Sequence, residues 1–379
     1  MATAEKPIWF QSSREQLDAL LLEVCDGLQL RPSRHELAVE RYGTVNEILE
    51  KAGSPFRFLR PRIFPQGSMA LGTTCKPVEG PHDLDFVLQI DAPHWRWHPL
   101  AGLSALYECL SSNETYRKMI SLKNRVVRLT YADEFYMDIL PAYTDLSSGG
   151  TCILVPDRAR VSLCPSNPEG FILWFRNRCL TRTRRVMEKA KPVPAQEAVH
   201  EKEPLQLAVQ LLKRWRDLAF AEECLAPISV VLTTLAGMYY AGEESVSEAM
   251  TTILSGIVNA IALEDLQGKR IVVRNPSNLL EDFGERWDAN PQAYNAFKAG
   301  IRRLQKEWTV IVAGGRETDK ELERLFGEYV RTALVKRAQR LQEARKAGAL
   351  AVGSTGAITG LASTSPRKIP SRQIGRLPS

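Results

Sequence analysis

The sequence lacks the common signatures of disulfide-bonded, membrane-inserted and P-loop proteins. Its seven cysteines are an odd, scattered set without a C-x-x-C pair, which is typical of reduced thiols rather than of a disulfide framework or a zinc site. Neither a Gly-x-x-x-x-Gly-Lys-Ser/Thr loop nor a Gly-x-Gly-x-x-Gly turn occurs, so P-loop and Rossmann chemistry are not indicated. The first residues form no basic and then apolar signal, and no run approaches the roughly 20 apolar residues of a membrane span. These absences predict a soluble, cytoplasmic protein without a membrane partner.

A strong excess of positive charge is also missing from most of the chain. The net charge is +6, and residues 347–379 supply four basic residues and no acid, so the rest is nearly balanced. A local basic stretch spans residues 176–191 and could meet triphosphates or a polynucleotide. No aromatic residue lies among these charges after Phe175, which removes the stacking platform of a single-strand binder. A solvated helix face is the favoured interpretation of this stretch.

What the sequence does contain is a glycine-serine turn at the end of an apolar segment. Gln66, Gly67 and Ser68 follow the apolar residues 56–64. Glycine lets the backbone approach a phosphate closely, while the serine hydroxyl and the amides after it donate hydrogen bonds to anionic oxygens. The turn is therefore predicted to bind phosphate groups.

Three carboxylates follow this turn in a pattern that suits divalent metal. Asp83 and Asp85 open an apolar strand and share one of its faces, because side chains two residues apart in a strand point the same way. Asp138 lies inside an apolar strand, where a lone acid requires a metal or another partner. Two Mg²⁺ ions, or Mn²⁺, held by these acids would bind a donor triphosphate and lower the pKa of an attacking hydroxyl. Each feature alone is common, but their conjunction predicts nucleotidyl transfer.

The hydrophobic pattern predicts an α+β protein with a mixed central sheet and a mostly helical second half. Strands are expected near residues 57–65, 83–91, 123–132 and 135–141. Helices are expected near 14–28, 33–51, 100–112, 169–190, 203–221, 227–241, 245–262, 289–312 and 317–347. We expect three parts, which are a catalytic core with N-terminal helices over 1–165, a helical lobe over 166–347 and a flexible basic tail over 348–379.

Three segments carry a family resemblance: Gly67–Thr73, His82–Val87 and Met137–Ala142. They resemble the bacterial cGAS/DncV-like nucleotidyltransferases (CD-NTases) of the polymerase-β-like superfamily, and the resemblance covers roughly residues 30–310. It implies a nucleotidyltransferase lobe and an oligoadenylate-synthase-like helical lobe, with the active site in the cleft between them. It also implies that ATP, GTP or other nucleoside triphosphates are joined into a cyclic di- or trinucleotide with release of pyrophosphate. That product would act on a downstream effector in a CBASS antiphage system, in which accessory proteins are possible partners.

The resemblance extends into the second half of the chain. Residues 205–215 resemble the helix that carries a phosphate-binding lysine in this family, and Lys213 matches that lysine. Ser229, in the segment 227–232, occupies the place of a serine or tyrosine that contacts the donor nucleotide. The resemblance thus adds Lys213 and Ser229 to the expected nucleotide site, while Asp138 would bind the catalytic metal and help to deprotonate a ribose hydroxyl.

Two departures from related enzymes bear on this interpretation. Fourteen residues separate Ser68 from Asp83, more than the superfamily pattern, which predicts an extended loop around Gly80. No cluster of cysteines with a nearby histidine matches the zinc thumb of animal cyclic GMP-AMP synthase, so direct activation by double-stranded DNA is not expected. The pair His94 and His98 has a helical metal spacing, but flanking prolines favour a surface loop.

Two other functions stay open at the level of sequence. The chain could transfer a nucleotide to another acceptor, such as an RNA 3′ end, a small molecule or a protein. It could also be a catalytically idle nucleotide-binding protein, although the presence of all three carboxylates argues against that. A labelled product that stays attached to RNA or protein would identify the first alternative, and nucleotide binding without pyrophosphate release would identify the second.

Overall fold

The computed structural model describes residues 13–30, 32–91, 98–132, 134–180, 197–220, 222, 224–314 and 317–347, together with the backbone of 350–352 and 358–360. Of residues 32–35 only the backbone is described. His94 and most of the basic stretch 176–191 lie outside the described residues, so the predictions made for them are not addressed by the structure.

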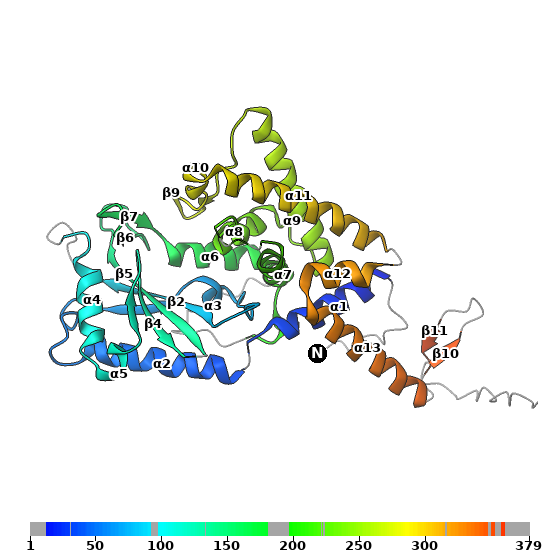
Figure 1. Cartoon of the computed structure of the whole chain (residues 1–379), viewed down its shortest axis with the longest axis horizontal. Helices are drawn as coiled ribbons and strands as arrows, with labels where there is room; N and C mark the ends of the chain where they lie inside the picture. The colour runs from blue at the N-terminus through cyan, green and yellow to red at the C-terminus, as the bar shows by residue number, and fades with distance from the viewer. Residues whose placement is uncertain are drawn as a thin grey trace, which may run out of the picture.

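The first half of the chain forms one mixed sheet, as predicted (Figure 1). Its strands follow the spatial order β1-β2-β5-β4-β3, and β6 and β7 extend the sheet from the far end of β5. β2 and β5 run parallel, and the other pairs are antiparallel. The strands are β1 (Arg62–Pro65), β2 (His82–Ile90), β3 (Ile120–Leu122), β4 (Val127–Tyr131), β5 (Phe135–Thr144), β6 (Ile153–Asp157) and β7 (Ser162–Ser166).

Strand alternation decides which side chains of β2 enter the core. Leu84, Phe86 and Leu88 are fully buried in a cluster that lies under α2 and α4. Asp83 and Asp85 alternate with them and so lie on the other face of the sheet. The helices of this half are α2 (Pro32–Glu50), α3 (Gly67–Leu71), α4 (Ala101–Ser111) and α5 (Glu114–Arg117). The fold thereby leaves the acids on the face turned away from this core.

The second half is mostly helical and encloses its own core. Its elements are α6 (Pro168–Cys179), the 3₁₀ turn η3 (Val199–Glu201), α7 (Pro204–Ala219), α8 (Ser229–Tyr239), α9 (Val246–Leu266), β8 (Arg274–Asn275), β9 (Asn278–Asp282), α10 (Arg286–Ala289), α11 (Pro291–Ala313), α12 (Thr318–Phe326) and α13 (Glu328–Lys346). The N-terminal helix α1 (Ser13–Leu28) buries Leu21, Val24 and Leu28 in this helical core. Figure 1 shows α1 lying beside α13 on that side of the molecule. The boundary proposed at residue 165 stays a prediction.

The prediction of one continuous helix over residues 317–347 is wrong. Residues 317–347 form two helices, α12 and α13, rather than one. Gly327 separates them with φ +79, a conformation that favours glycine, and its backbone lies against the guanidinium of buried Arg214. The break follows from packing against α7, which a periodicity argument does not include.

Several short elements were not predicted from the sequence. The strands β3, β6 and β7 are short, and β1 begins only at Arg62, five residues after the expected start. In the tail, the backbone of β10 (Leu350–Val352) pairs antiparallel with β11 (Ile358–Gly360), within a segment expected to be flexible. β3 pairs with β4, β6 with β7 and β10 with β11, and these short neighbouring strands are stabilised by pairing, which local propensity does not reveal.

One helix is long and apolar enough to cross a membrane by length and composition alone. α9 has 21 residues and a most apolar window of mean hydropathy 1.5, and it is the one such helix in the described part of the chain. The expectation that no run approaches this length was therefore too strong. α9 buries seven of its side chains in the helical core, among them Met250, Ile253, Leu254 and Ile257, as the core helix of a globular domain does.

Candidate active site

The parallel pairing of β2 with β5 brings the three predicted acids together. In this register Asp85 lies directly beside Asp138, and Asp83 lies beside Tyr136. The three side chains differ in exposure, since Asp83 is exposed, Asp85 is half-buried and Asp138 is only 9% exposed. Burial, and after it the charges of Asp138 and Asp83, raise the pKa of Asp85 to about 7. The cluster thus concentrates negative charge in a partly desolvated place.

An arginine that the sequence analysis did not single out neutralises part of this charge. Arg128, on β4, lies opposite Asp138 in the antiparallel register. Its Nε and Nη2 each donate to one carboxylate oxygen of Asp138 at 2.7 Å, and Nη2 also donates to Asp83 Oδ1 at 3.2 Å. The guanidinium stacks over the Tyr136 ring at 4.5 Å. Such a bidentate pair is among the stronger charge-assisted contacts in proteins.

The glycine-serine turn lies against the acids. β1 ends at Pro65, and the amide of Gln66 donates to the main-chain oxygen of Asp85 at 2.8 Å. Gly67 has φ +58, and a Cβ at this position would lie 2.7 Å from Asp85 Oδ2. Only glycine therefore permits this approach without displacing the carboxylate. Ser68 is half-buried in the first turn of α3, one residue further along.

Lys213 and Ser229, the two residues suggested by the family resemblance, lie in different surroundings. Lys213 Nζ donates to the main-chain oxygen of Thr73 at 3.0 Å, just after α3, and its charge lowers the pKa of Asp85 against the larger effects that raise it. Lys213 therefore belongs to the same site as the acids. Ser229 begins α8 and accepts a hydrogen bond from Arg216. The described contacts of Ser229 involve this arginine and its own helix rather than the acids.

The acid cluster offers the carboxylate oxygens that Mg²⁺ prefers as ligands, but these oxygens are not arranged around a common metal position. In the described part of the chain, no group of three or more His, Cys, Asp or Glu side chains is arranged to hold a metal ion. Both oxygens of Asp138 and one of Asp83 face Arg128 instead. Burial, and after it the two neighbouring carboxylates, raise the pKa of Asp85 against the smaller opposing effects of Lys213 and Arg128. Carboxylate oxygens of this kind suit a hard divalent cation once the arginine moves aside.

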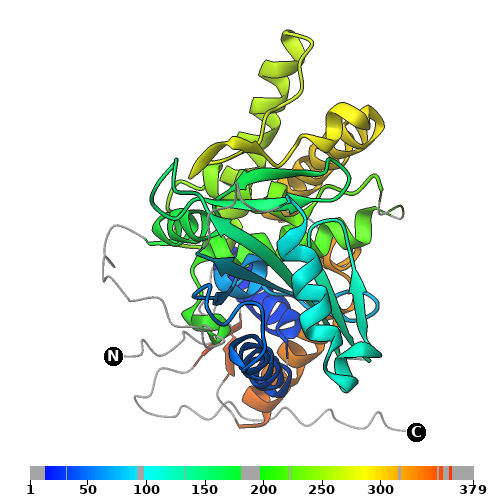
Figure 2. The same cartoon turned by 90° about the vertical axis from the view of Figure 1, so that its left-hand side faces the viewer.

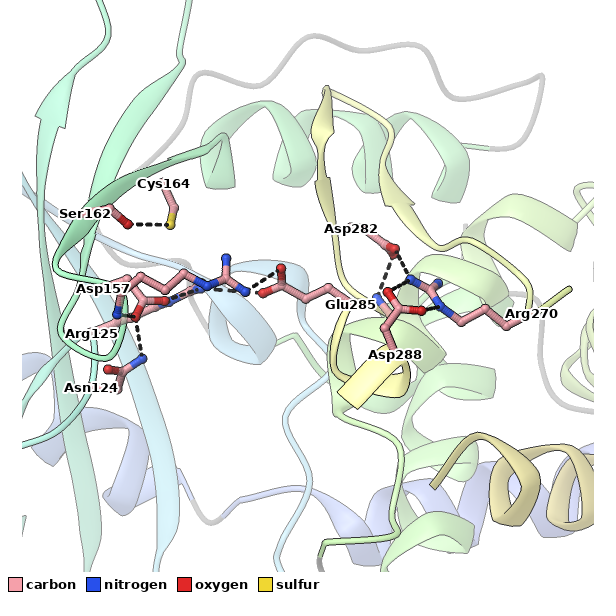
Figure 3. A network of polar contacts seen from close by, with 11 residues as sticks. Asn124, Arg125, Asp157, Ser162, Cys164, Arg270, Asp282, Glu285 and Asp288 are labelled. Atoms are coloured by element: carbon pink, nitrogen blue, oxygen red, sulfur yellow. Dashed lines mark hydrogen bonds and ion pairs between the residues drawn. The ribbon is translucent and has the colours of Figure 1, made fainter. Parts of the chain in front are cut away.

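A cavity of about 480 Å³ lies between the two halves of the molecule. Asn124, Arg125 and Asp157 line it from the sheet, and Glu281 and Ile228, which directly precedes Ser229, line it from the helical half. Figure 3 shows Arg125 bonded to Asp157 on one side, with Glu285 in the middle of the network. Glu285 also pairs with Arg160 at 3.0 Å. The two halves therefore meet through the ion pairs of Arg125 and Arg160 with Glu285 around this cavity.

A second cavity, of about 430 Å³, lies away from the acids around Arg270 and Lys298. Arg270 is bonded to Asp282 and Asp288, as the right side of Figure 3 shows. Lys298 is paired with Asp265 at 2.9 Å. Arg270 and Lys298 thus have carboxylate partners, whereas Lys269, a third cation in the lining, donates to Gln267 Oε1 at 3.1 Å.

Several known proteins are similar to this chain. Residues 16–178 match the family described as the Second Messenger Oligonucleotide or Dinucleotide Synthetase domain. A c-di-GMP synthase from Roseivirga ehrenbergii is 31% identical over 357 residues, which cover 92% of this chain and 94% of that protein. The cyclic dinucleotide synthase CdnG from Bradyrhizobium diazoefficiens is 29% identical over 85% of this chain and 83% of its own length.

A solved structure gives the same result at the level of the fold and of the enzyme family. The CD-NTase CdnG of Bradyrhizobium diazoefficiens in complex with GTP superposes with a TM-score of 0.73 and 26% identity, over 85% of this chain and 98% of that one. Both halves of the chain therefore have counterparts in an enzyme of this kind. The chain belongs to the CD-NTases of the cGAS/DncV-like family, and it is a nucleotidyltransferase that makes a cyclic oligonucleotide from nucleoside triphosphates.

Proposed function

We propose that this enzyme joins two molecules of GTP into cyclic di-GMP and releases pyrophosphate. The observation that carries the proposal is the register of β2 with β5, which sets Asp85 beside Asp138 while the Gly67 backbone lies against Asp85. The choice of base is supported by the relatives, because the curated one that is 31% identical is a c-di-GMP synthase and the solved CdnG holds GTP. ATP as one of the two substrates is the alternative that the assay below separates.

Asp83, Asp85 and Asp138 are the proposed ligands of two Mg²⁺ ions, for which Mn²⁺ could substitute. When bound, such ions supply charge neutralisation of the triphosphate and acidify the attacking hydroxyl. The protein's part is to hold the carboxylates on one face, where Arg128 donates to both oxygens of Asp138. Asp138, the most buried of the three, is the proposed base for the ribose hydroxyl.

The proposed donor site consists of the glycine-serine turn together with Lys213 and Ser229. Gln66, Gly67 and Ser68 would bind the phosphates through the amides after Gly67 and the serine hydroxyl. Lys213 is near enough to Asp85 to lower its pKa, so its ammonium can also reach an anion at the acids. Ser229 would contact the donor from the start of α8, beside the Ile228 wall of the cavity between the halves.

The biological setting is proposed from the family. The product would act on a downstream effector in a CBASS antiphage system in the cytoplasm, with accessory proteins as possible partners and without direct activation by DNA. The conjunction of the acids with a complete helical half supports this enzyme class over transfer to RNA or protein.

The test is an incubation of the full chain with each radiolabelled ribonucleoside triphosphate, singly and together, with Mg²⁺ or Mn²⁺. Phosphatase treatment and mass spectrometry then identify any resistant product. GTP alone should yield cyclic di-GMP. Asp83→Ala and Asp85→Ala should abolish it, whereas Asp91→Ala, an exposed acid just after the same strand, should not. A product that requires ATP, or that stays attached to RNA or protein, would refute the proposal.

A further inference from the structure

Four successive main-chain oxygens just after the glycine-serine turn accept hydrogen bonds from side chains of the segment 202–213. The donor and acceptor pairs are Gln206 Nε2 to Leu71 at 3.0 Å, Lys202 Nζ to Gly72, Lys213 Nζ to Thr73 at 3.0 Å, and Gln210 Nε2 to Thr74 at 2.7 Å. Three of these donors come from α7 at positions 206, 210 and 213, a spacing that puts them on one helix face.

The local structure explains why these oxygens need partners from elsewhere. α3 has only five residues, and the last carbonyls of a helix have no N–H donor within the helix. Gly72 ends α3 with φ +68, which turns the following chain toward α7. A Cβ at Gly72 would lie 2.4 Å from Gln206 Nε2, so glycine is required for this contact too. The end of α3 is therefore built to meet α7.

The donors are buried at a cost that the contact must offset. Lys202 and Gln206 are each 8% exposed, and Gln210 is fully buried. Desolvation lowers the pKa of Lys202, which reflects the removal of its charge from water. Among the described residues Gln210 Oε1 is buried without a hydrogen-bond partner, so the donation of its Nε2 to Thr74 is the interaction there that justifies an amide at this position. Apolar residues would fill the same space without that cost.

We infer that Lys202, Gln206 and Gln210 are positioning residues, which fix the turn at Gly67 and Ser68 in register with Lys213 and the helical half. In the described part of the chain, their side chains donate to these main-chain oxygens and to Glu197 rather than to the three acids. They act by pinning the C-terminal end of α3, so that its N-terminal end meets a triphosphate in a preset geometry. This inference rests on the proposed function, in which that turn binds the donor phosphates.

The test uses Lys202→Met and Gln210→Met, which keep the side-chain length and remove the donors, with Lys202→Arg as the conservative variant that keeps a donor. Tyr294→Phe is the matched control, because it removes one buried contact, the main-chain amide of Ile271 to the Tyr294 hydroxyl at 3.0 Å, far from the turn. Two quantities are measured on each full-length protein. These are hydrogen exchange of the amides of residues 67–73 without nucleotide, and KM and kcat for GTP.

The methionine variants should exchange faster at residues 67–73 and raise KM for GTP about five- to tenfold, the effect of one lost hydrogen bond, with a smaller change in kcat. Lys202→Arg and Tyr294→Phe should retain wild-type KM. Unchanged exchange would overturn the inference, and so would faster exchange with unchanged KM. If Lys202→Met does not fold, the result for Gln210→Met decides the test. This variant is expected to fold because it also removes the buried oxygen Oε1, which has no hydrogen-bond partner among the described residues. Wild-type protein that neither binds nor consumes GTP would refute the proposed function itself, independently of the exchange result.

Discussion

Replacement of Arg128 by methionine should destabilise the metal-free enzyme far more than the metal-loaded one. Arg128 is the counterion of Asp138, with two contacts of 2.7 Å, and Asp138 is 9% exposed. Removal of one partner from a buried ion pair leaves an uncompensated charge, which costs about 3–5 kcal/mol. The third contact, to Asp83, adds little because that side chain is 57% exposed. Since Arg128 itself is 23% exposed, we expect a loss near the lower limit, about 3 kcal/mol.

This loss can be measured as a shift of the melting temperature. With an unfolding entropy of about 2 cal/mol/K per residue, a loss of about 3 kcal/mol in a chain of 379 residues lowers Tm by about 4 °C. The assay is thermal unfolding of wild type and Arg128→Met in EDTA, and then with increasing Mn²⁺. Because metal need not displace the arginine in the variant, Mn²⁺ should raise its Tm more than that of wild type and should close the gap.

A matched control separates this effect from the general loss of an arginine on the sheet. Arg62 also stacks over an aromatic ring, that of Phe64 at 4.4 Å, and pairs with a carboxylate, Glu169 at 2.6 Å. Its side chain is 50% exposed, so Arg62→Met should change the free energy of unfolding by less than about 1 kcal/mol. Equal Tm values for Arg128→Met and wild type in EDTA would refute the reasoning, as would a gap that Mn²⁺ does not reduce.

Three further predictions concern other parts of the chain. Gly67→Ala should lower turnover at least about tenfold, because the added Cβ would meet Asp85. Gly80 has a similar φ of +73, but a Cβ added there has no atom within 4 Å, so Gly80→Ala should carry only the backbone strain. Equal turnover in the two variants would contradict this prediction. Arg214→Met removes a buried donor to the Phe326 oxygen at 3.1 Å and should lower the free energy of unfolding in urea by about 2 kcal/mol, with turnover per folded molecule unchanged; an unchanged urea midpoint would argue against it. Burial raises the pKa of Glu281 above its ordinary 4.5, so the free energy of unfolding of the wild type should fall as pH rises past 4.5. Glu281→Gln does not titrate at this position, so it should become more stable relative to wild type as pH is raised from about 4 to about 8. A stability difference in urea unfolding that stays constant over this range would exclude the effect.

The acids could be predicted from the sequence because their signal is local. Asp83 and Asp85 alternate with buried Leu84 and Phe86, and Asp138 interrupts an apolar strand. Their mutual register could not be predicted, since it depends on the parallel pairing of two strands that are about 50 residues apart. The sheet and most helices of the second half were also predicted, while the break at Gly327 depends on a neighbouring helix and was missed.

Arg128 was missed although a usable signal existed. β4 and β5 are joined by a short turn, so their antiparallel pairing is a hairpin whose register follows from the turn position. Counting outward from the pair Tyr131 and Phe135 sets Arg128 opposite Asp138. For Gln206 and Gln210 the signal is weaker, because a polar residue on the buried face of an amphipathic helix does not reveal which backbone it meets.

Arg128 and the α7 donors each stabilise one part of the same site. A site that is to neutralise a triphosphate with metal must hold several carboxylates close together. Such a cluster is unfavourable when no metal is present, and burial, followed by the charges of Asp138 and Asp83, raises the pKa of Asp85. Arg128 supplies charge from within the same sheet, so the acids stay in place before metal arrives. The turn that faces them is held instead through the carbonyls that follow it, by two glutamines of α7 and by Lys202 and Lys213. Arg128 balances the acids through contacts that a metal could replace, whereas Gln206 and Gln210 hold the turn through buried, neutral contacts that metal and nucleotide need not break.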